Sequence, residues 1–181
     1  MFGIAVLIGT VLINTYVFRS FNVEGPSMEV TMSTGDRLIV NRLPVTWSQL
    51  TNQSYLPERG QIIVFKNPRY TIGSPDEFIV KRVIGLPGER VKLENGKFTV
   101  YNESHPGGFD PDEANGGEPG SPTSGAEKEV TVPEGTIYVA GDHRDGSYSF
   151  DSRNGLGFVP LYDVVGPVAM RILPVTDIRV F

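Results

Sequence analysis

The sequence predicts a mainly β protein, in which a barrel-like or two-sheet β domain follows one N-terminal apolar helix. Three observations lead to this fold class. Residues 1–18 are apolar and uncharged, the rest of the chain contains short β-branched runs, and glycine and proline separate those runs. No helical period of useful length follows residue 18, so we expect residues 19–181 to form one β-rich domain.

The N-terminal run reads MFGIAVLIGTVLINTYVF, and its only polar residues are Thr10, Asn14 and Thr15. A helix of this length covers roughly 27 Å at about 1.5 Å per residue, close to a bilayer core of about 30 Å. We therefore expect 1–18 to be a transmembrane anchor, with a buried core helix as the alternative. A cleaved secretory signal fits less well, because no small-x-small site follows the run.

The expected strands are short runs rich in valine, isoleucine and aromatic residues. Five of them lie at 37–41, 61–66, 78–84, 136–140 and 164–173. A further pair, 91–93 and 98–100, flanks Asn95-Gly96, which favours a tight type I′ turn. This pair is therefore the clearest hairpin in the sequence.

Residues 102–128 differ in composition from the rest of the chain. They read NESHPGGFDPDEANGGEPGSPTSGAEK, which is rich in glycine, proline and acidic residues and holds one aromatic residue. Such a segment buries too little apolar surface to offset the entropy lost on ordering. We expect a flexible, low-complexity surface insertion.

Composition and charge exclude several classes of function. The net charge of -5 makes nucleic acid an unfavourable partner, because phosphate binding needs a basic face. The absence of cysteine excludes thiol catalysis and thiolate metal sites. Two histidines, His105 and His143, do not provide a multi-histidine metal site or a histidine-rich proton relay. We expect neither a metal nor an organic cofactor.

A first candidate catalytic residue is Ser27, in the sequence Val23-Glu-Gly-Pro-Ser-Met. The Gly-Pro pair before it imposes a turn or extended geometry that can lift the serine side chain into the open. Most serines in this context are simply turn residues. The position therefore becomes informative only together with a suitable base.

The candidate base is Lys81, which shares its strand face with Ile79 and Val83. An edge-strand lysine that reaches water is the alternative. Burial between apolar neighbours would lower the lysine pKa from about 10.4 toward ~7–8, at a cost of about 4 kcal/mol. The neutral amine could then take a proton from a serine hydroxyl near neutral pH.

Residues 141–153 form a turn-rich segment with three aspartates, two arginines and three serines. The plain interpretation is a charged loop that closes on itself through Asp–Arg pairs. The functional interpretation keeps that scaffold and adds a serine hydroxyl that reaches Lys81. The charged scaffold residues are Asp142, Arg144, Asp151 and Arg153, and the serines considered are Ser147 and Ser149.

Four blocks of the sequence resemble those of bacterial type I signal peptidases in order and in kind: GPSM, GDRLIVNR, IVKRVIGLPGE and GDHRD…DSRNGLGFVP. They extend over most of 23–168 apart from the insertion. Together they are specific for this family, although no single block would suffice. The resemblance implies a membrane-bound serine endopeptidase with a Ser–Lys dyad. Such an enzyme is a single-pass protein of the cell membrane. Its β-rich catalytic domain lies on the outer face and removes signal peptides from exported preproteins after a small-x-small sequence.

Position by position, the resemblance makes Ser27 the nucleophile and Lys81 the general base. Asp142, Arg144, Asp151 and Arg153 match the supporting network. Ser149 or Ser147 matches the serine that orients the lysine, and the spacing to Asp151 favours Ser149.

The sequence departs from the family at three places, one of which is two extra residues between Asp145 and Asp151. His143 stands where the family usually has asparagine. Gly25 stands where some members carry a hydroxyl side chain that stabilises the oxyanion. The backbone N–H of Ser27 would then be the main oxyanion donor, and losing one such donor costs about 3 kcal/mol in other enzymes.

The expected reaction is acyl transfer through a serine ester, with secretory preproteins as substrates and membrane lipid around the anchor. About nine residues separate Phe18 from Ser27 and reach at most ~30 Å, so we expect the site near the bilayer surface. One alternative is another Ser–Lys processing peptidase, such as a self-cleaving repressor or a conjugation-linked protease; the anchor argues against a repressor. Another is a membrane-tethered β domain that binds a partner without catalysis, and the intact Ser27 and Lys81 argue against it.

Overall fold

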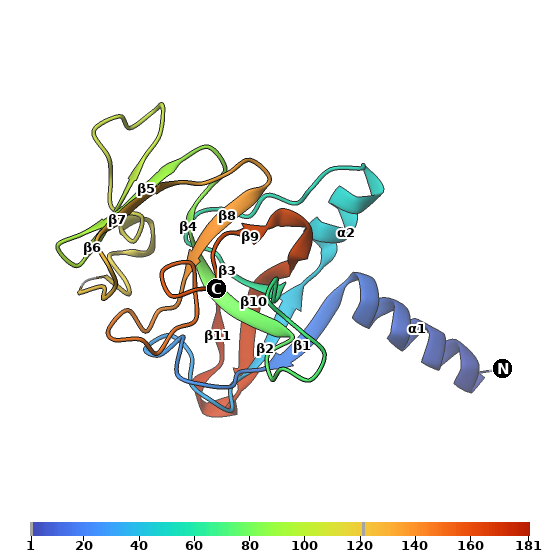
Figure 1. Cartoon of the computed structure of the whole chain (residues 1–181). Helices are drawn as coiled ribbons and strands as arrows, with labels where there is room; N and C mark the ends of the chain where they lie inside the picture. The colour runs from blue at the N-terminus through green and yellow to red at the C-terminus, as the bar shows by residue number, and fades with distance from the viewer. Residues whose placement is uncertain (1, 121) are drawn as a thin grey trace.

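Strands make up most of the regular secondary structure, and they form two sheets (Figure 1). The structure, a computed structural model, describes residues 2–120 and 122–181. The larger sheet is curled and has the strand order β1-β2-β10-β3-β4-β8-β9, with β11 paired to β10. The smaller sheet has the order β6-β5-β7. The predicted class, mainly β with two sheets, is confirmed.

The larger sheet contains β1 (Phe18–Asn22), β2 (Arg37–Asn41), β3 (Ile62–Lys66), β4 (Phe78–Gly85), β8 (Thr136–Ala140), β9 (Val159–Pro160), β10 (Val164–Leu173) and β11 (Arg179–Val180). The smaller sheet contains β5 (Arg90–Glu94), β6 (Lys97–Tyr101) and β7 (Lys128–Thr131). The helices are α1 (Phe2–Tyr16), α2 (Leu43–Leu50) and three short 3₁₀ turns, η1 (Glu113–Asn115), η2 (Leu161–Asp163) and η3 (Val175–Asp177).

The predicted strands and hairpin are present. β5 and β6 pair up to Glu94 opposite Lys97, which leaves a two-residue turn. Asn95 and Gly96 in that turn have φ angles of 51° and 72°. A type I′ turn requires positive φ at both central residues, so the Asn-Gly prediction is confirmed in detail.

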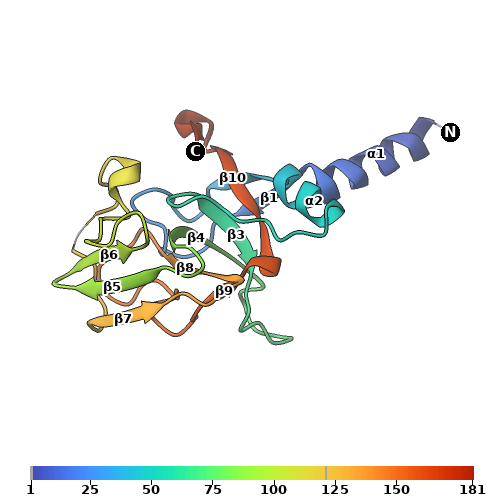
Figure 2. The same cartoon turned by 90° about the horizontal axis from the view of Figure 1, so that it is seen from above.

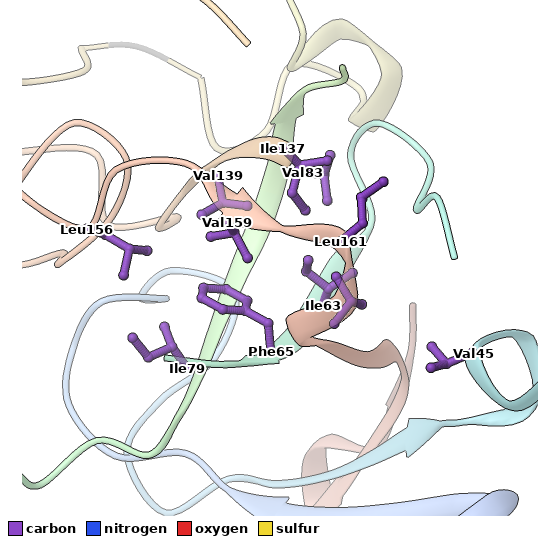
Figure 3. Packing of buried hydrophobic residues seen from close by; sticks show 11 residues of the cluster. Val45, Ile63, Phe65, Ile79, Val83, Ile137, Val139, Leu156, Val159 and Leu161 are labelled. Atoms are coloured by element: carbon purple, nitrogen blue, oxygen red, sulfur yellow. The ribbon is translucent and has the colours of Figure 1, made fainter. Parts of the chain in front are cut away.

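The main apolar core lies on one face of β3, β4 and β8 (Figure 3). Phe65 from β3, Ile79 and Val83 from β4, and Val139 from β8 are buried there. Because side chains alternate along a strand, this packing fixes which side of β4 faces the core and which side faces away. The core therefore sets the position of Lys81, which lies between Ile79 and Val83 in sequence.

The N-terminal helix differs from the expected 1–18. α1 ends at Tyr16, because Phe18 already pairs with Asn41 as the first residue of β1, and Met1 lies outside the described residues. In the described residues, no helix is both long and apolar enough to cross a membrane. The alternative of a buried core helix is wrong, since α1 projects from the β body and side chains such as Leu7 are largely exposed (Figures 1 and 2).

The expectation of no further helix is also wrong, because α2 forms at Leu43–Leu50. Pro44 lies in its first turn, where a missing N–H costs nothing. Val45 packs into the main core and fixes the helix against the sheet. Eight residues are too few to give a clear helical period in the sequence.

The segment 102–128 makes more contacts than a free surface loop would. Phe109 bridges back to Val100 of β6 with backbone N···O distances of 2.9 Å in both directions. Asp112 is buried and pairs with Arg144. The segment expected to be a flexible surface insertion therefore contributes a buried ion pair to the fold, because a buried guanidinium needs a carboxylate partner.

Candidate active site

Two segments that are far apart in the sequence enclose an open cleft of about 370 Å³. One wall is 21–27, and the other is 75–81, which includes the first half of β4. β3 pairs with β4 along its whole first half, whereas β8 pairs with β4 only from Arg82 onward. The β8-side edge of β4 is therefore open where it faces the cleft. Ser27 and Lys81 both line this space.

Ser27 sits in a tight turn that exposes its side chain to the cleft. The carbonyl of Pro26 accepts a hydrogen bond from the N–H of Glu29 at 3.0 Å, and Gly25 has a φ of 81°. The next residue, Met28, is fully buried and anchors the turn in the second apolar cluster. The Gly-Pro-Ser-Met sequence therefore holds the serine at the surface while the methionine beside it is packed.

Lys81 lies directly opposite the serine. Its Nζ is 2.7 Å from Ser27 Oγ and donates a second hydrogen bond of 2.7 Å to the carbonyl of Val80. The residue is only 3% exposed, so the alternative of an edge lysine that reaches water is wrong. Burial lowers the pKa of Lys81 to about 8, although the charges of Asp151 and Asp142 act in the opposite direction. The desolvation predicted from the apolar strand face is the main cause.

Ser149 and Ser147 have different environments. Ser149 is fully buried, and its hydroxyl donates to Asp151 Oδ2 at 2.6 Å, whereas Ser147 is exposed on the loop. A Cβ at Gly141 would lie 2.2 Å from Ser149 Oγ and 2.3 Å from the Ser27 carbonyl oxygen, so only glycine fits there. Ser149 is thus packed beside the segment that carries Ser27, but the described contacts include no direct hydrogen bond from it to Lys81.

Asp151 is the centre of this buried cluster. It accepts hydrogen bonds from Arg153, from Ser149 and from the N–H of Gly141. Burial alone would raise its pKa, but the Arg153 guanidinium, followed by Ser149 and Gly141, holds the pKa of this carboxyl below its usual range. Arg153 also donates to the carbonyl of Arg144 at 3.0 Å. The predicted pairing of Asp151 with Arg153 is present.

Asp142 has a partner outside its own loop. Arg82 donates to both carboxylate oxygens at 2.8 and 2.5 Å, and Thr31 Oγ1 donates to one of them at 2.6 Å. Arg82 follows Lys81 on β4, so this pair joins the strand that carries the lysine to the 141–153 loop. Sequence reasoning missed Arg82 and Thr31. The sequence did offer one indication for Arg82: a second charged residue on a strand predicted to be buried needs a partner of opposite charge.

Arg144 likewise pairs outside the loop. Its two terminal nitrogens each lie 2.7 Å from an oxygen of Asp112, in a fully buried, two-point geometry. The interpretation of 141–153 as a loop that closes on itself is therefore correct only for Asp151 and Arg153. Asp142 and Arg144 connect the loop to β4 and to the 102–128 segment instead.

His143 contacts the turn that carries Ser27. Its N–H donates to the Ser27 carbonyl at 3.1 Å, and its ring Nδ1 lies 3.1 Å from the Pro26 carbonyl. The ring stacks on Tyr148, with 4.6 Å between centroids. His143, the residue that departs from the family pattern, therefore contacts the carbonyls of two consecutive peptides, at Pro26 and at Ser27.

The comparisons with known proteins agree on one family. The family described as "Signal peptidase, peptidase S26" matches residues 1–173. Signal peptidase I of Bacillus licheniformis is 32% identical, over 97% of this chain and 89% of that protein. Signal peptidase I T of Bacillus subtilis is 31% identical, over 97% of this chain and 84% of that protein. A solved signal peptidase I from Enterococcus faecalis is 30% identical with a TM-score of 0.45, over 61% of this chain and 95% of that chain.

Proposed function

The chain belongs to the signal peptidase family, peptidase S26, and from this membership we propose that it removes N-terminal signal peptides from exported preproteins, with Ser27 as nucleophile and Lys81 as general base. The single observation that carries the mechanism is the 2.7 Å separation of Ser27 Oγ and a buried Lys81 Nζ. This distance is within the range for direct proton transfer.

In the proposed first step, the neutral amine of Lys81 takes the proton of Ser27 Oγ as the oxygen attacks the scissile carbonyl. The resulting ammonium then protonates the leaving amine, and a serine ester remains. In the second step the amine activates a water molecule that hydrolyses this ester. With a pKa of about 8, roughly a tenth of Lys81 is neutral at pH 7 and about half at pH 8.

The open edge of β4 supports binding of the preprotein as an extended strand between 21–27 and 75–81. In an extended peptide, the first and third residues before the cleaved bond point to the same side, and the second points away. We propose the small-x-small specificity from the family membership, with both small side chains on the same side of the bound strand.

We further propose that residues 1–18 tether the domain to the cell membrane, with the catalytic domain on its outer face. Leu7, Val11 and other aliphatic side chains of α1 are exposed and cover no part of the β body. Lipid is the environment in which such a surface is stable. Membrane-held preproteins would then meet the cleft close to the bilayer.

The test is cleavage of a preprotein with a known signal peptide by the detergent-solubilised chain, with the product's new N-terminus read by mass spectrometry. Cleavage after the small-x-small site, abolished in a folded Ser27→Ala variant, is the expected result. Cleavage elsewhere would favour a different Ser–Lys processing peptidase. A folded wild-type chain that cleaves no preprotein would favour a non-catalytic binding domain and overturn the proposal.

A further inference from the structure

The loop 145–151, which is two residues longer than the family pattern, places two aromatic side chains in the cleft. Tyr148 and Phe150 line the same space as the two catalytic side chains, and they are 62% and 43% exposed. Ser149 between them is fully buried, which anchors the loop and leaves its two neighbours at the surface. Exposed aromatic side chains in a substrate cleft indicate a binding surface, because they are costly to leave in water.

Tyr148 is held in place although its ring is exposed. The ring stacks on His143, with 4.6 Å between the centroids and 27° between the planes. A Cβ at Gly146 would lie 3.1 Å from Cε2 of the same ring, so the ring also packs on the backbone of its own loop. His143 is fixed in turn by its contacts with the carbonyls of Pro26 and Ser27. A ring fixed in this way loses little conformational entropy when it binds a ligand.

The position of Tyr148 identifies the part of the substrate that it meets. The two walls of the cleft, 21–27 and 75–81, each end at a catalytic residue. In the proposed binding mode, the residues before the cleaved bond lie along these walls. Tyr148 contacts the His143 ring, which itself contacts the carbonyls at the end of the first wall, so Tyr148 lies beside the catalytic end of the cleft. The part of the substrate that continues past this end is the start of the mature protein.

We propose that Tyr148, stacked on His143, selects preproteins with an aromatic or large aliphatic side chain at the first position after the cleaved bond. This inference rests on the proposed function and names a part of the preprotein that the same site recognises. A phenol ring with one face stacked on an imidazole offers its remaining surface to an apolar partner, and aromatic side chains pair with it best. Because both His143 and the longer loop depart from the family pattern, this selectivity belongs to the present chain.

The test compares versions of one preprotein that carry phenylalanine, leucine, serine or lysine at the first mature position, each cleaved by the full chain in detergent. Mass spectrometry of the products confirms that the same bond is cleaved in each. We expect kcat/KM for phenylalanine and leucine to exceed that for serine by about fivefold, the size of one aromatic contact. Tyr148→Ala should abolish this preference, and Tyr148→Phe should keep it. The matched control is Tyr162→Ala, at an 80% exposed tyrosine in η2, which should also keep it.

His143 is a positioning residue in this proposal, and two variants separate its stacking from its hydrogen bonding. His143→Asn removes the ring beneath Tyr148, so the preference for phenylalanine over serine should fall at least about twofold, mainly through KM. His143→Phe keeps a ring for stacking but has no Nδ1, and it should keep the preference. Equal losses of kcat/KM for all four substrates in His143→Asn would show a merely structural role and overturn this assignment.

Other outcomes would overturn the selectivity proposal and are distinguishable. Equal kcat/KM for all four substrates in the wild type would remove the selectivity and leave the peptidase function intact. A preference that Tyr148→Ala retains would assign the selectivity to another part of the cleft. A preference for lysine that Tyr148→Ala removes would assign the ring to a cation instead. A folded wild type that cleaves none of the substrates would overturn the proposed function, and this inference with it.

Discussion

Replacing Lys81 with methionine should abolish activity and make the protein more stable near neutral pH. The lysine is almost completely buried, and its pKa falls from 10.5 to about 8. A shift of this size corresponds to about 3 kcal/mol of unfavourable free energy for the folded, charged form, at about 1.4 kcal/mol per pKa unit. Methionine fills a similar volume without that charge. Loss of the hydrogen bonds to Ser27 and Val80 offsets part of the gain, which leaves about 2 kcal/mol.

The sign of the pH dependence follows from the direction of the shift. Since the folded pKa lies below the unfolded value, the unfolded chain binds more protons between about pH 8 and 10.5. The destabilisation by Lys81 is therefore complete below about pH 8, decreases as the pH rises toward 10.5 and is absent above it. The free energy of unfolding of Lys81→Met should exceed that of the wild type at pH 7 and approach it at pH 10.

The measurement is thermal unfolding of both proteins in the same detergent across this pH range. A gain of about 2 kcal/mol corresponds to a rise in Tm of about 4–8 °C for a domain of this size. Leu156→Met, at another fully buried position, controls for the introduction of methionine and should show no pH-dependent difference. A wild type that is more stable than Lys81→Met at pH 7, or a constant difference from pH 7 to 10, would refute the desolvation argument.

Three further predictions test the site. Below its plateau, wild-type kcat/KM should rise with pH through a free-enzyme pKa near about 8, and a fully active Lys81→Arg variant would contradict the dyad, because guanidinium keeps its proton. Ser149→Ala should lower kcat/KM by roughly tenfold to a hundredfold, because Asp151 and the Ser27 segment that Ser149 packs against would shift. Ser147→Ala, at an exposed position, should keep kcat/KM within about twofold of the wild type. Steady-state kinetics that reverse this order would refute the assignment. Asp112→Ala should destabilise by about 3–5 kcal/mol in thermal unfolding, because it leaves a buried guanidinium unpaired. Exposed Glu103→Ala is its control, and equal Tm values for the two would refute the contact.

The strands and the burial of Lys81 could be predicted because local patterns indicate them, whereas Ser27 was singled out through the set of four blocks that resembles the family. Alternation along 78–84 indicated that Lys81 shares a face with apolar residues, and burial of that face is what lowers its pKa. The Asn95-Gly96 turn followed from backbone sterics alone. In each case the indication lies within a few positions of the sequence, although distant segments such as the turn at Ser27 complete the burial of Lys81.

The missed features depend on partners distant in sequence. Asp112 looked like one acid among many in a polar segment, and its role appears only when Arg144, 32 positions later, is buried beside it. Arg82 and Asp142 are 60 positions apart. Composition describes a segment by its average, whereas a single buried ion pair can fix that segment in place. The same limit applies to α2, which is held by Val45 in the core and by hydrogen bonds from Arg42 and Thr46 to 16–17 rather than by its own length.

The ion pairs around the site resolve an apparent conflict in its electrostatics. Asp151 and Asp142 both lie close enough to Lys81 to raise its pKa, yet the amine must be neutral to act as a base. Each carboxylate is paired with its own arginine, Arg153 or Arg82. Because these guanidinium groups neutralise most of the negative charge, burial remains the dominant influence on Lys81. The site therefore keeps the rigidity of a buried, hydrogen-bonded scaffold without forcing its lysine to hold a proton.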